Sequence, residues 1–246
     1  MCGLLAGLVG GFMGLGGGVM MVPYMTIILG MDIKEAVPVS LIAVAVGALS
    51  ASTAYLKKSM VDSELVVIIS IFMVIGSVMG SLLSAVISSA VLQVLFSVVV
   101  LCAGIMMLFK KENKQPAIHR GHGYVYFILA GAIALVVGAL GSLVGLGGGL
   151  FIIPVLYLLF GLSIDIARGT SALTIGFAAA AASIIYFFNG QLDPSAAAPV
   201  MLGVAVGGTL GGHLGTEAKP MVVKIIFFGI MLYIAYKLGV EGFKNL

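Results

Sequence analysis

The residues with the clearest chemical potential in this chain are two glycine runs that carry the same five letters. Residues 14–18 and 145–149 both read Gly-Leu-Gly-Gly-Gly, and a proline follows each run five residues later. A glycine inside a helix costs roughly 1 kcal/mol relative to alanine, so both runs predict a helix break. A break exposes backbone N–H groups, and the helix that restarts beyond it directs its positive end into the gap. Such a gap can bind a small anion without a charged side chain.

The elements that carry these glycine runs are predicted to lie in a membrane. Hydrophobic residues make up 61% of the 246-residue chain and charged residues only 9%, whereas a soluble domain has about 25% charged residues. This composition, with a net charge of +3 scattered along the chain, excludes a soluble domain, a nucleic-acid-binding surface and a disulfide scaffold. Solidly apolar runs favour helices over a β-barrel, because barrel strands alternate in hydrophobicity.

The charged residues divide the chain into apolar segments of membrane-spanning length, which is about 20 residues for a helix. Uncharged runs cover residues 1–31, 36–56, 65–109, 121–164, 169–192 and 194–216, and a last apolar segment runs from about Pro220 to Lys237. The run 65–109 is long enough for two spans with a turn at Ser84, Ser88 and Ser89. We therefore predict an all-α, polytopic membrane protein with about eight membrane segments, in which the first helix of each half is broken at its glycine run.

An internal repeat relates the two glycine runs. With an offset of 131 residues, 7–30 align with 138–161 without a gap, and nine of the 24 aligned pairs are identical. Two similar halves with glycine-interrupted segments at matching positions are typical of secondary transporters. We expect one transmembrane domain, with repeat 1 at 1–111, a basic cytoplasmic connector at 112–123 and repeat 2 at 124–246. The same offset aligns Ser40 with Ser171, Ser52 with Ser183, Tyr55 with Tyr186, Asp62 with Asp193, Gly76 with Gly207, and Gly80 with Gly211.

Hydroxyl side chains near the starts of the second and sixth segments supply further candidate donors for an anion. We expect these helix starts and the two glycine breaks to converge near the bilayer midplane, although ordinary N-capping would also explain the hydroxyls. The paired glycines later in each half are interpreted as close helix packing. The candidate substrate-binding residues are Gly16, Gly17, Gly18, Ser40, Gly147, Gly148, Gly149, Arg168, Thr170 and Ser171.

Four polar residues inside or beside the apolar segments each have two interpretations. Arg168 could attract the anion, or it could pair with Asp165 and extend to the lipid headgroups. His213 could carry a proton in coupled transport, or it could be a polar group near a helix end. Gln93 and Lys224, which align across the repeat, could touch the anion path or bond to a neighbouring helix.

The chain resembles the sulfite exporter TauE/SafE family, also called the toluene sulfonate uptake permeases. The resemblance rests on the pattern Gly-x-x-Gly-x-x-x-Gly-Leu-Gly-Gly-Gly with its following proline, present in both halves, and on Ala-Arg-Gly-Thr-Ser at 167–171. Residues 36–40 of the first half keep only the alanine and the serine of that second pattern. The resemblance covers nearly the whole chain and implies a membrane carrier for small sulfur-containing anions such as sulfite, sulfonates or sulfoacetate.

Two arrangements of the halves are compatible with the distribution of basic residues. If all eight segments cross the membrane once, the halves are parallel and Lys and Arg divide eight against four between the two sides. If the glycine-broken segments are re-entrant, the halves are inverted and the division is nine against three. Because basic residues concentrate in the cytoplasm, we favour the inverted arrangement. Its basic side would hold Lys57, Lys58, Lys110, Lys111, Lys114, Arg120, Arg168, Lys219 and Lys224.

The function expected from these observations is that of a permease for small sulfur oxyanions that works by alternating access. The expected location is the plasma or inner membrane, as a multi-pass protein with the Lys110–Arg120 loop in the cytoplasm. Its expected partners are the anion, membrane lipid, and protons or another coupling ion, with no cofactor, metal or nucleic acid. An anion channel or a membrane scaffold subunit is the alternative. An intramembrane enzyme is disfavoured, because all nine acidic residues fall in connectors.

Overall fold

The computed structural model describes residues 2–108, 124–217, 229, 232–233 and 236–237, and its regular structure is helical. Four of its helices, α3, α4, α8 and α9, are long and apolar enough to cross a membrane. In chain order the elements are α1 (Cys2–Met13), α2 (Gly18–Pro23), the π-helix η1 (Tyr24–Ile28), α3 (Ile33–Lys57), α4 (Ser63–Ser84), α5 (Ser89–Leu108), α6 (Tyr124–Leu143), α7 (Gly149–Leu158), α8 (Ile164–Phe188) and α9 (Pro194–Glu217).

Short polar side chains fix where the long helices begin. The carboxylate of Asp32 accepts a hydrogen bond from the Lys34 N–H at 2.8 Å, and that of Asp62 accepts one from the Leu65 N–H at 3.1 Å. Ser163 and Asp193 accept equivalent bonds before α8 and α9. Such caps satisfy N–H groups that have no partner inside the helix. The helix starts therefore lie at or beside the charged clusters that divide the sequence.

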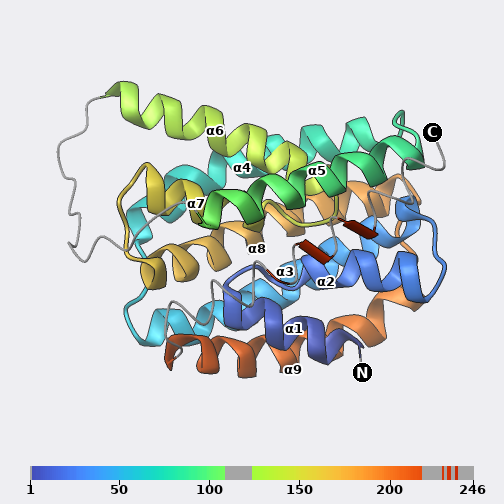
Figure 1. The fold of residues 1–246 in the computed structure, drawn as a ribbon, viewed down its shortest axis with the longest axis horizontal. Helices are drawn as coiled ribbons and strands as arrows, with labels where there is room; N and C mark the ends of the chain where they lie inside the picture. The colour runs from blue at the N-terminus through green and yellow to red at the C-terminus, as the bar shows by residue number, and fades with distance from the viewer. Residues whose placement is uncertain (1, 109–123, 218–228, 230–231, 234–235, 238–246) are drawn as a thin grey trace.

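Both glycine runs break a helix, as the sequence predicts. Each run places three glycines in the left-handed region, which only glycine adopts without strain. The φ values are 75°, 74° and 96° at Gly14, Gly16 and Gly17, and 77°, 64° and 85° at Gly145, Gly147 and Gly148. The chain reverses at each break, so that α1 with α2 and α6 with α7 form two hairpins (Figure 1).

The helices lie roughly along one axis, with α3 and α8 packed together in the interior (Figure 1). Helix α1 packs along α9, and α6 packs along α4. Gly76 and Gly80 of α4 lie against the backbone of α6, while Gly207 and Gly211 of α9 lie against the backbone of α1. A Cβ at these glycines would meet backbone carbonyl oxygens, so the interpretation of the paired glycines as close packing is confirmed.

The outward faces of the long helices are apolar, and their exposed side chains recur at helical spacing. On α4 these include Val67, Ile71 and Ile75, and on α9 they include Leu202, Val206, Leu210 and Leu214. A surface of this kind is stable in contact with lipid, where it needs no polar covering. The prediction of an all-helical fold is therefore confirmed for the described residues, and four of the helices could span a membrane.

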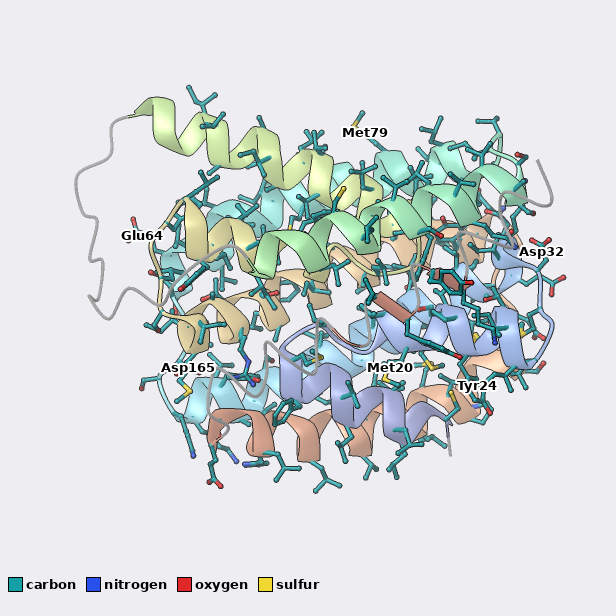
Figure 2. All side chains as sticks on the ribbon, in the orientation of Figure 1. Met20, Tyr24, Asp32, Glu64, Met79 and Asp165 are labelled. Atoms are coloured by element: carbon teal, nitrogen blue, oxygen red, sulfur yellow. The ribbon has the colours of Figure 1, made fainter. Side chains whose placement is uncertain are left out.

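One hydrogen bond and one ion pair establish which helix ends lie together. Ser89 donates to the carboxylate of Asp32 at 2.8 Å, which joins the starts of α3 and α5. At the opposite end Lys58 pairs with Glu217 at 3.3 Å, which joins the ends of α3 and α9. Figure 2 shows Asp32 and Tyr24 toward one end of the molecule, and Glu64 and Asp165 toward the other.

Parts of the sequence prediction lie outside the described residues. These are the basic connector 112–123, Lys224 and most of the last apolar segment. The division into two repeats, their connector and about eight segments stays a prediction.

Candidate substrate site at the glycine hinges

Each glycine break is a tight hinge held by backbone hydrogen bonds. In the first hinge the N–H groups of Leu15 and Gly16 donate to the carbonyl oxygen of Gly10 at 2.8 and 3.2 Å. In the second, the N–H groups of Leu146 and Gly147 donate to Gly141 at 2.8 and 3.0 Å. Two of the predicted anion donors, the amides of Gly16 and Gly147, are therefore engaged within their own hinges in this structure.

The two hinges lie against each other in the core of the molecule. A Cβ on Gly18 would lie 2.6 Å from the carbonyl oxygen of Gly145, and one on Gly149 would lie 3.3 Å from the Cα of Leu15. All ten residues of the two hinges, 14–18 and 145–149, are buried. Val44 from α3 and Ile175 from α8, which align across the repeat, pack against Gly16 and Gly149 respectively. The structure thus brings together the six glycines of the predicted set.

Ser40 and Ser171 each contact the hinge that belongs to the other half of the chain. The hydroxyl of Ser40 donates to the carbonyl oxygen of Gly145 at 2.8 Å, and that of Ser171 donates to Gly14 at 3.3 Å. Both side chains are fully buried. Neither serine caps its helix, because α3 begins at Ile33 and α8 at Ile164. The capping interpretation is therefore wrong for these two hydroxyls.

Thr170 faces away from the hinges and toward the connector between α3 and α4. Its hydroxyl oxygen accepts a hydrogen bond from the Asp62 N–H at 3.0 Å. The side chain is fully buried. This bond ties the start of α8 to the start of α4, which gives Thr170 a structural role in this conformation.

Arg168 is fully buried beside the first hinge. Its Nη2 donates to the carbonyl oxygen of Phe12 and to the hydroxyl of Tyr55, the latter at 3.1 Å. Its guanidinium also lies 5.7 Å from the centroids of both aromatic rings, a favourable arrangement for a cation. Because the last carbonyls of α1 carry partial negative charge, the arginine stabilises the broken end of that helix.

The expected ion pair of Arg168 with Asp165 is present, but the arginine does not extend to the headgroups. Its Nη1 lies 3.4 Å from the carboxylate of Asp165, which is 38% exposed, while the arginine side chain has no exposure. The expectation that it reaches the lipid surface is wrong, because α1 offers carbonyl acceptors 156 positions earlier in the chain. Its Nε is buried and has no hydrogen-bond partner among the described residues.

Two tyrosines outside the predicted set hold the ends of the broken helices. Tyr55 donates to the carbonyl oxygen of Gly11 at 3.0 Å, and Tyr186 donates to that of Ser142 at 3.2 Å. Donor and acceptor both align across the repeat at the offset of 131. This alignment was the available signal for their role, since an identical buried tyrosine at matching positions points to a shared contact.

Two of the residues considered for ion coupling or the anion path, His213 and Gln93, form no hydrogen bond with the hinges among the described residues. His213 lies on α9 with an exposed side chain, and its backbone carbonyl accepts from Thr216 at 2.7 Å. Gln93 lies on α5, and its buried Oε1 has no hydrogen-bond partner in the part of the chain that the structure describes. Lys224 lies outside the described residues. A role for any of the three stays a prediction.

Comparison with known proteins supports a transport function. The family model described as "Sulfite exporter TauE/SafE" matches residues 1–238. The "Probable membrane transporter protein YunE" of Bacillus subtilis is 29% identical, over 98% of this chain and 96% of its own length. A "Probable membrane transporter protein" of Xylella fastidiosa is 24% identical, over 96% of this chain and 93% of its own length. No solved structure matches the chain.

Proposed function

Because the chain belongs to the sulfite exporter TauE/SafE family, we propose that this membrane transporter is a secondary carrier for small sulfur-containing anions. Sulfite, sulfonates and sulfoacetate are the proposed substrates. The observation that carries the proposal is the mutual contact of the two hinges, in which Ser40 and Ser171 each bond to the hinge of the other half. A carrier needs one site that both halves share and that their relative movement can expose.

An inverted arrangement of the two halves supports movement of this kind. The hairpin of α1 and α2 begins and ends toward the end that holds Asp32 (Figures 1 and 2). The hairpin of α6 and α7 begins and ends toward the end that holds Asp165 (Figures 1 and 2). In the proposal both hairpins are re-entrant in the cell membrane. The end of the molecule that contains Lys57 and Lys58 faces the cytoplasm.

The hinges supply suitable groups for an oxyanion once they separate. In this structure the serine hydroxyls donate to carbonyl oxygens of the opposite hinge. Each such bond contributes about 0.5–1.5 kcal/mol, so the two can be exchanged for bonds to a substrate at modest cost. The hydroxyls would then turn to the anion, together with the amides of Gly17, Gly18, Gly148 and Gly149 at the starts of α2 and α7.

The absence of fixed cations among these donors suits transport. A site built from hydroxyls and amides replaces the hydration shell of an anion without holding it so tightly that release becomes slow. Arg168 lies close to the first hinge, but its Nη1 and Nη2 are already bound to protein groups. In the proposal it stabilises the hairpin rather than touching the substrate.

Flux measurements in proteoliposomes test the proposed function. Purified protein should take up labelled sulfite with saturable kinetics, and an internal excess of unlabelled sulfite should accelerate the uptake. Sulfate, thiosulfate and short alkyl sulfonates should be compared as competitors, with empty liposomes as the control. Ion current far above carrier turnover would replace the proposal with an anion channel, and no flux of any of these anions would favour the scaffold alternative.

A further inference from the structure

An apolar cavity of about 400 Å³ opens beside the first hairpin. Its volume lies in the range of small-molecule binding sites, which is roughly 300–1,000 Å³. Figure 2 shows two of its lining residues, Met20 and Tyr24, the latter toward the end of the molecule that holds Asp32. Its lining residues include Leu5, Ala6, Met20 and Tyr24 of the first hairpin, together with Tyr233 and Lys237.

The wall has one charged group, the ammonium of Lys237. Gly229, Tyr233 and Lys237 are spaced four apart in the sequence, which is the spacing of residues on one face of a helix. Within the described part of the chain, Lys237 forms no ion pair, and the hydroxyls of Tyr24 and Tyr233 form no hydrogen bond. The lining residues include no carboxylate, so within the described residues this ammonium beside an apolar wall lacks a counter-ion.

The first hairpin, which lines the cavity, differs from the second hairpin at this place. The chain after Pro23 winds into the π-helix η1, whereas the corresponding residues after Pro154 continue as the α-helix α7. Short π-helical segments occur frequently at functional sites. The second half also carries Val137 and Phe151 where the first half carries Ala6 and Met20 in the cavity wall. Larger side chains at these positions would fill the space.

We infer that the cavity binds one acyl chain of an anionic phospholipid whose phosphate pairs with Lys237. Lipid is the solvent of this part of the molecule, since the neighbouring side chains of Leu5 and Ile28 are 57% and 66% exposed. The apolar wall accepts the chain, and a lysine presents the compact positive charge that binds phosphate. The tyrosine hydroxyls are placed to donate to the ester and phosphate oxygens at the interface, where tyrosine is enriched in membrane proteins.

Tryptophan fluorescence gives a direct test, because the chain contains no tryptophan. Tyr233→Trp places a single reporter in the cavity wall, and Phe177→Trp places one on the lipid-facing side of α8, where the phenylalanine is 46% exposed. Both variants are reconstituted with increasing fractions of brominated phosphatidylglycerol or brominated phosphatidylcholine. The cavity reporter should be quenched at about fivefold lower fractions of the anionic lipid. The α8 reporter should respond to both lipids equally.

Two further variants separate charge recognition from chain binding. Lys237→Gln should abolish the preference of the cavity reporter for phosphatidylglycerol. Ala6→Val with Met20→Phe, which copies the second half of the chain, should reduce quenching by both lipids. Equal quenching of the cavity reporter by the two lipids, or a preference that survives Lys237→Gln, overturns the inference. Displacement by brominated palmitate at a concentration below that of phosphatidylglycerol would assign the cavity to a free fatty acid and also overturn it. None of these outcomes depends on sulfite transport.

Discussion

The hydroxyl of Ser171 donates a hydrogen bond to the carbonyl oxygen of Gly14, 157 positions earlier in the chain, at 3.3 Å. Its aligned partner Ser40 makes the reciprocal bond to Gly145 at 2.8 Å. Each half of the chain therefore holds the hinge of the other half. These reciprocal bonds hold the two hinges against each other, so the site needs residues from both halves of the chain.

Ser40→Ala and Ser171→Ala are expected to weaken anion transport. Loss of a hydroxyl that donates to the anion in the open state removes about 0.5–1.5 kcal/mol, so KM should rise roughly 2- to 10-fold for each variant. Ser52→Ala is the matched control, since that hydroxyl donates to the Leu49 carbonyl in its own helix at 2.7 Å. Unchanged KM in both folded variants would remove the two serines from the substrate site.

Gly16→Ala should destabilise the protein more than Gly30→Ala. Both glycines have positive φ, 74° and 67°, so both substitutions strain the backbone. A Cβ at Gly16 would also lie 2.9 Å from Val44, whereas one at Gly30 would meet nothing within 4 Å. In a thermal-shift assay, we expect the melting temperature of Gly16→Ala to be clearly lower than that of Gly30→Ala. Equal losses would mean that the hinge contact is loose enough to accept a methyl group.

Arg168→Lys should lower stability while leaving anion affinity intact. A lysine retains the positive charge but cannot reproduce the contacts of a guanidinium with Phe12, Tyr55 and Asp165. Loss of hydrogen bonds in this buried cluster should cost about 1–3 kcal/mol, which denaturant titration of the detergent-solubilised protein can measure. Sulfite binding, measured by calorimetry below the melting point, should change less than threefold. A tenfold weaker Kd would place Arg168 in contact with the anion.

Acid should weaken the start of α9 through Asp193. Hydrogen bonds from the Ser195 hydroxyl and backbone lower the pKa of this carboxyl group below its usual value. Because the folded pKa is depressed, the stabilisation is present above the unfolded pKa of about 4 and disappears as pH falls through the folded pKa. Wild type should therefore melt above Asp193→Asn at neutral pH, and the difference should vanish in acid. A difference independent of pH would contradict this role of the charge.

The sequence predicts the hinges well because their cause is local. Three closely spaced glycines followed by a proline disfavour a continuous helix wherever the chain places them, and the in-register repeat identifies the same feature twice. The apolar runs and charged clusters likewise predict the helix ends, because lipid excludes charged groups over a known thickness.

The burial of Arg168 and the roles of the tyrosines were not predictable in the same way. Arg168 is buried because carbonyl oxygens at the end of α1 happen to face it, and α1 lies in the other half of the chain. From the sequence, its nearest partner was Asp165, three positions away, and an exposed pair was the simpler expectation. The apolar cavity also escapes sequence reasoning, since it depends on a π-helical turn and on smaller side chains at Ala6 and Met20.

Arg168 aligns with Val37 across the repeat, so the two hairpins are fastened differently. To draw α1 away from α8, the protein must give up a guanidinium anchor on Phe12, whereas at the corresponding contact Val37 offers the second hinge only its hydrocarbon. The two hairpins, which match in sequence, are therefore held by contacts of unequal strength. If the two hairpins separate during transport, as proposed, the hairpin held by Arg168 is expected to separate over the higher barrier.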